Sequence, residues 1–133
     1  NQRRLNILEK LKDNGINFKH IFGVYGSELD ELISNSKFFL NLHYYESKIL
    51  ESIRLFYLIT NKVPILTEIS DSTVDDQDFK SLTYYSNYDN LLDKCIELLN
   101  YDYSLIMEET LINHQKLLLN HGANLLQNQD HCI

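Results

Sequence analysis

Basic residues, cysteines and long apolar runs are all scarce in this sequence of 133 residues. Twelve Lys and Arg against 19 Asp and Glu give a formal net charge of −7, which argues against binding bare nucleic acid, since that needs clustered cations. The two cysteines, Cys95 and Cys132, lack the spacing of a metal or redox motif. No apolar run approaches the ~20 residues that cross a bilayer, and no signal peptide opens the chain. We therefore expect a cytoplasmic protein with reduced thiols and no transmembrane segment.

Motifs of several enzyme classes are also missing. Gly23-x2-Gly26 is too short for a dinucleotide fingerprint, and Ser70 lacks the glycines that flank a hydrolase nucleophile. The acidic segment 71–78 has neither the glycine nor the ligand spacing of a calcium loop. We therefore predict neither a metal site nor a cofactor.

Apolar residues, at 44% of the chain, recur in patterns that alternate between helix and strand. We predict one domain over residues 1–123 and a C-terminal tail over 124–133. The expected elements, in order, are a helix ending at Gly15, a strand over 18–22, a helix from 27, a strand over 38–42, a helix from 47 or 48, strands over 63–67 and 82–85, a helix after 89, and a helix from 104 to Gly122. Ser27, Asp89 and Ser104 are the predicted N-terminal caps.

This alternation predicts an α/β fold with right-handed crossovers and a mainly parallel sheet. We expect a Rossmann-like, three-layer domain of about four strands flanked by helices. In such sheets ligands bind beyond the carboxyl ends of the strands. That rule selects the segments 23–26, 43–46, 68–71 and 85–86 as the expected location of a site.

The segment from His43 to Arg54 carries the densest chemistry of the four. Glu51 and Arg54 are three residues apart on a predicted helix and hence on one face. An Arg one turn inside a helix that faces a cleft can bind a diphosphate, and Tyr44 and Tyr45 can stack on a base or a sugar ring. The alternative is an exposed ion pair, with the tyrosines closing the edge of the core.

Several short motifs in the same order resemble the C-terminal domain of group 1 glycosyltransferases, in the branch that includes spore-maturation-type enzymes. The segments that carry the resemblance are 3–15, 26–30, 37–46, 49–56 and 61–68. Together they span roughly residues 1–100. The resemblance implies a GT-B architecture, in which two Rossmann-like domains face each other and the C-terminal domain holds a nucleotide-sugar donor without a metal.

The resemblance also implies roles for individual residues. Arg3 or Arg4, with Arg54, would neutralise the donor diphosphate and so stabilise the leaving nucleotide. Glu51 would contact ribose or sugar hydroxyls. The residues expected to bind the donor are Arg3, Arg4, His43, Tyr44, Tyr45, Glu46, Glu51, Arg54 and Glu68.

Three departures from the family pattern limit this expectation. In the family a central β-strand precedes the helix that carries Arg3 and Arg4, and this sequence begins at the helix. Tyr57 follows Arg54-Leu55-Phe56 where many family members have Glu. The N-terminal acceptor domain is absent, so we expect this chain alone to be inactive and to need that domain or a partner chain, with self-association a further expectation. The alternative is a catalytically silent α/β interaction module that keeps the fold without binding a donor.

Overall fold

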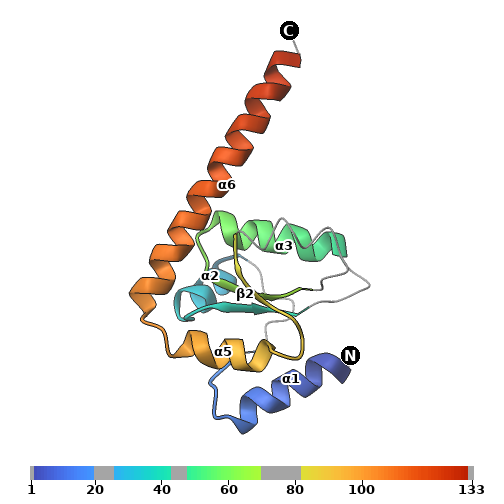
Figure 1. The fold of residues 1–133 in the computed structure, drawn as a ribbon, viewed down its shortest axis with the longest axis vertical. Coiled ribbons are helices and arrows are strands. Elements are labelled where there is room, and N and C mark those ends of the chain that lie inside the picture. The colour runs from blue at the N-terminus through green and yellow to red at the C-terminus, as the bar shows by residue number, and fades with distance from the viewer. Residues whose placement is uncertain (1, 20–25, 43–47, 70–81, 132–133) are drawn as a thin grey trace.

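A computed structural model describes residues 2–19, 26–42, 48–69 and 82–131, with only the backbone for 48–53 and 120–131. Its elements, in chain order, are α1 (Gln2–Asp13), α2 (Gly26–Ser34), β1 (Phe39–Asn41), α3 (Lys48–Thr60), β2 (Ile65–Glu68), β3 (Tyr84–Ser86), α5 (Leu91–Leu99) and α6 (Tyr103–His131). The arrangement is α/β, as the sequence predicts (Figure 1).

The described strands form a parallel sheet in the order β1-β2-β3, three strands where about four were expected. Leu40 of β1 pairs with Leu66 of β2, which in turn pairs with Tyr84 of β3. All four residues of β2 are buried. The predicted strands 38–42, 63–67 and 82–85 are therefore confirmed, each with its bounds moved by one or two residues.

Helices cover both faces of the sheet and complete three layers (Figure 1). On one face, Ile7 and Leu11 of α1 and Leu91 and Leu98 of α5 form a core with Leu66. On the other face, the core joins α3, β2 and α6 through Leu55, Leu58, Ile59, Ile65 and Leu117. The alternation of side chains along β2 assigns Leu66 to the first core and Ile65 to the second.

The end of α1 follows the prediction at Gly15. This residue has φ +68°, a conformation that glycine adopts at low cost. The Gly15 N–H donates to the Lys12 carbonyl and the Ile16 N–H to the Leu11 carbonyl, each at 3.0 Å. This pair of bonds is a Schellman motif, and it turns the chain from α1 toward residues 16–19.

Four predictions about element ends are wrong. Ser27 lies inside α2, which begins at Gly26, and Ser104 lies inside α6, which begins at Tyr103. The N-cap of α5 is Asn90 rather than Asp89, and it makes no side-chain capping bond. α6 passes Gly122 and continues to His131, because one glycine costs a helix only about 1 kcal/mol. The domain boundary at 123 stays a prediction.

The predicted strand over 18–22 lies only partly within the described residues. Phe18 and Lys19 are not in a strand, and 20–22 lie outside the described part of the chain.

Burial of Cys95, which is 3% exposed, raises the pKa of its thiol from 9.0 to about 11. The folded state favours the neutral Cys95 thiol, so this group contributes fully to the free energy of unfolding below pH 9. The contribution is lost as the pH rises through about 11. In a Cys132→Ser variant, we expect Cys95 to react with a thiol reagent at least about tenfold more slowly in the folded chain than in guanidinium. Equal rates would contradict the burial of Cys95.

Candidate functional site

The carboxyl ends of the three described strands bring Asn41, Glu68 and Ser86 to one edge of the sheet. This is the edge at which open parallel sheets bind their ligands. Helices α1 and α3 reach it from opposite faces. Each of them contributes an arginine that is held by a buried polar residue of the sheet.

On the α3 face, Arg54 is held at the end of β1. Its Nη2 donates to Asn41 Oδ1 at 2.5 Å, and Asn41 Nδ2 donates to Thr67 Oγ1 at 3.1 Å. Asn41 is 1% exposed and Thr67 2% exposed. A buried amide of this kind has few alternative orientations, so it fixes the guanidinium in place.

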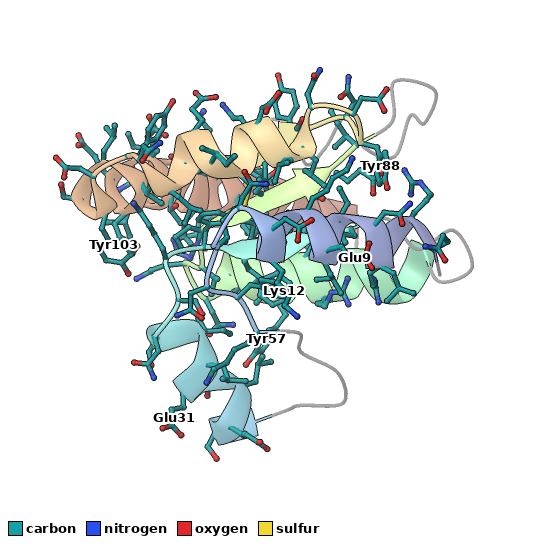
Figure 2. All side chains as sticks on the ribbon, turned by 90° about the horizontal axis from the view of Figure 1, so that it is seen from below. Glu9, Lys12, Glu31, Tyr57, Tyr88 and Tyr103 are labelled. Carbon is teal, nitrogen blue, oxygen red and sulfur yellow. The ribbon has the colours of Figure 1, made fainter. Side chains whose placement is uncertain are left out.

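On the α1 face, Arg3 forms an ion pair with Glu68, whose side chain is 3% exposed. The guanidinium carbon of Arg3 lies 4.2 Å from the centre of the Tyr88 ring, a cation–π distance. The Tyr88 hydroxyl donates to the Arg3 carbonyl at 3.0 Å. Figure 2 shows Tyr88 beside α1. These contacts fasten the first turn of α1 to the carboxyl edge of the sheet.

A cavity of about 290 Å³ opens between α1 and β1, and both Arg4 and Arg54 line it. These two arginines therefore line one space from two different helices. Most of the remaining lining is apolar, including Leu8, Leu11 and Leu40. Cationic groups bordering a largely apolar cavity suit an anionic group attached to a less polar body.

The other predicted site residues divide into two groups. Arg3 and Glu68 lie at the predicted edge, but they bind each other. Glu51 lies on α3 with its side chain outside the described part. The segment His43-Tyr44-Tyr45-Glu46 is also outside the described residues.

Sequence reasoning did not select Asn41, Thr67 or Tyr88. Asn41 had a visible signal, because it is a polar residue inside the apolar run 38–42. A buried strand rarely carries an amide without a bonding partner. Tyr88 had no such signal, since its partner is 85 residues away in the sequence.

Tyr57 bonds to α2. Its hydroxyl lies 3.5 Å from Asp30 Oδ1, and its side chain is 44% exposed (Figure 2). This position therefore joins two helices.

Within the described residues, no group of three His, Cys, Asp or Glu side chains is placed to hold a metal ion. No helix in this part is long and apolar enough to cross a membrane.

Comparisons with family models, with curated proteins and with solved structures found no match to this chain.

Proposed function

We propose that this chain is the donor-binding domain of a GT-B-type glycosyltransferase and binds a nucleotide-diphospho-sugar at the carboxyl edge of its sheet. The observation that supports this best is the pair Arg4 and Arg54, which come from different helices and line one cavity between α1 and β1. A diphosphate carries negative charge on both phosphoryl groups, and arginine binds such groups through paired N–H donors.

The part-buried hydrogen bond from Arg54 to the buried Asn41 adds to this proposal. A guanidinium that is already oriented loses less conformational entropy when an anion binds. Arg4 and Arg54 line the cavity, so we assign the diphosphate contacts to them. Arg3, which pairs with Glu68, is a positioning residue for α1. The resemblance of residues 37–68 to group 1 glycosyltransferases supplies the nucleotide sugar as the ligand class.

In this proposal Glu51 and the segment 43–46 contact the ribose or the sugar, since α3 begins at Lys48 on the same edge of the sheet. Glycosyl transfer would require an acceptor domain or a partner chain, and we place the protein in the cytoplasm.

The test is a binding panel of UDP-, GDP- and ADP-sugars, read by thermal shift and by isothermal titration. We expect saturable binding by one nucleotide class, weakened about tenfold to a hundredfold in Arg54→Ala, because a hydrogen bond to a charged group contributes about 1.5–3 kcal/mol. The charge-matched control is Lys12→Ala. Lys12 is exposed and lies eight residues beyond Arg4 on α1, roughly 12 Å along the helix axis (Figure 2).

Equal affinities for the wild-type chain and the folded Arg54→Ala variant would remove Arg54 from the site. Binding weakened as much by Lys12→Ala would indicate attraction by general charge, without a specific site.

The second candidate is a silent interaction module. Tyr57 favours it, because a tyrosine bonded to Asp30 of α2 holds two helices together and supplies no carboxylate. Absence of binding by every nucleotide sugar, from a chain with a cooperative unfolding transition, would favour this candidate.

A further inference from the structure

Helix α6 has a buried face and an exposed apolar face. Ile106, Thr110 and Leu117 are buried, and Leu117 belongs to the core that α6 shares with α3 and β2. The opposite face carries five large apolar side chains that are 42–74% exposed, which are Leu105, Leu111, Ile112, Leu118 and Leu119. The core of the domain therefore accounts for only one face of α6.

The exposed apolar residues of α6 recur every seven positions. Leu105, Ile112 and Leu119 form one column along the helix, and Leu111 and Leu118 form a second column beside it. A seven-residue repeat keeps apolar side chains on one side of a helix and is typical of helices that pair with other helices. These five residues, here called the apolar stripe, extend over about 20 Å of α6. A continuous exposed stripe of this length indicates an interaction surface.

We propose that the apolar stripe is an interface between two copies of this chain, in which the α6 helices pair in antiparallel fashion about a two-fold axis at Ile112. In this register Ile112 meets Ile112 of the second copy. Leu105 and Leu119 are each seven residues from Ile112, so Leu105 of one copy meets Leu119 of the other. The first column is thus complementary to itself, as a two-fold interface requires.

The charges beside the stripe select the antiparallel direction. Glu108 and Lys116 are exposed and each lie four residues from Ile112, on opposite sides of it. Antiparallel pairing therefore sets Glu108 of one copy at the level of Lys116 of the other. Parallel pairing in register would set Glu108 against Glu108 and Lys116 against Lys116, and like charges facing each other disfavour an interface.

The arrangement of the domain leaves α6 accessible to a second copy. Figure 1 shows α6 extending well beyond the other elements of the chain. Two helices in contact along the stripe would bury on the order of 1,000 Å² in total, which is at the low end for specific interfaces. We therefore expect a dimer that dissociates when the protein is diluted to micromolar concentration.

A membrane surface suits the stripe less well than a second copy does. Helices that lie on membranes carry several Lys or Arg residues on their polar face, whereas Lys116 is the only residue of either type in the sequence of α6. The formal net charge of −7 also opposes binding to anionic lipids.

The first test measures the dissociation constant of the dimer by sedimentation equilibrium under reducing conditions. We expect Ile112→Glu to raise this constant at least about a hundredfold, because two carboxylates would face each other at the two-fold axis. Leu5→Glu is the matched control, since Leu5 is 54% exposed and lies on α1. It should change the constant by no more than about threefold. Thermal unfolding of the dilute chain verifies that each variant folds.

The second test exchanges the two charges. Glu108→Lys and Lys116→Glu each place like charges at the same level of an antiparallel pair, so we expect each to raise the dissociation constant about tenfold. The two variants change the net charge in opposite directions, which separates this effect from general repulsion. The double variant restores opposite charges and should return to within about threefold of the wild-type constant. A parallel pair would show no such rescue.

Three results would overturn the proposal. The first is a wild-type chain that stays monomeric up to about 1 mM. The second is equal weakening by Ile112→Glu and Leu5→Glu, and the third is a charge exchange without rescue. If the monomeric chain binds vesicles of phosphatidylcholine and phosphatidylserine and Ile112→Glu abolishes that binding, the stripe is a membrane surface instead. None of these measurements involves nucleotide-sugar binding, so the result is independent of the proposed function.

Discussion

Replacing Leu66 by alanine is expected to lower the free energy of unfolding by about 3–5 kcal/mol. Leu66 is 0% exposed and lies on the central strand β2, in the core formed with α1 and α5. The loss combines the transfer free energy of the removed methyl groups with the cost of the cavity that remains. Strands on both sides of β2 restrict the collapse of that cavity, so we expect the upper part of the known range.

Leu119→Ala is the matched control, because Leu119 is 74% exposed on α6. Its effect should stay within about 0.5 kcal/mol. Both variants can be compared by urea unfolding of the dilute, monomeric chain, fitted with one common dependence of the unfolding free energy on urea concentration. Similar losses for Leu66→Ala and Leu119→Ala would contradict the assignment of β2 to the centre of the core.

The second large effect is expected at the ion pair of Arg3 with Glu68. Arg3→Ala should cost about 2–4 kcal/mol, because it leaves a carboxylate that is 3% exposed without its cation. We place the value toward the lower end of what buried pairs cost, since Arg3 is 34% exposed and solvent screens part of the interaction. The stacking of Arg3 on Tyr88 is lost in the same variant.

A double-mutant cycle separates the ion pair from the packing. Glu68→Gln should cost less than Arg3→Ala, and the double variant should cost less than the sum of the two single variants. If the costs are additive, Arg3 and Glu68 do not interact energetically, and contacts other than this ion pair hold the first turn of α1.

The class of fold was predictable because hydrophobic burial gives direct signals in the sequence. The run 63–67 is apolar enough to predict a strand, and the strand β2 found there is buried throughout. The predicted N-terminal caps of the helices were wrong. Asp89 and Ser104 have suitable side chains, but the turn before α5 is set by Asn87, whose side chain accepts the Asn90 N–H at 2.9 Å. The residue at which a helix begins thus depends on the geometry of the preceding turn, which residue type alone does not specify.

The candidate site was predictable in its location but not in its pairings. Glu68 ends a strand and was expected to meet a ligand, and the structure pairs it with Arg3 instead. Those residues are 65 positions apart, and no local pattern connects them. Arg54 was selected for its place on a helix near the edge, whereas its partner Asn41 becomes apparent only when β1 and α3 are packed together.

The two attachments of the first turn of α1 have a consequence for the order of folding. They join positions 65 and 85 residues apart, from Arg3 to Glu68 and from Tyr88 back to Arg3. Closing such long loops costs conformational entropy before any contact forms. The full anchor of α1 exists only when the ends of β2 and β3 are paired, so we expect α1 to dock late, with low φ-values for substitutions in its first turn.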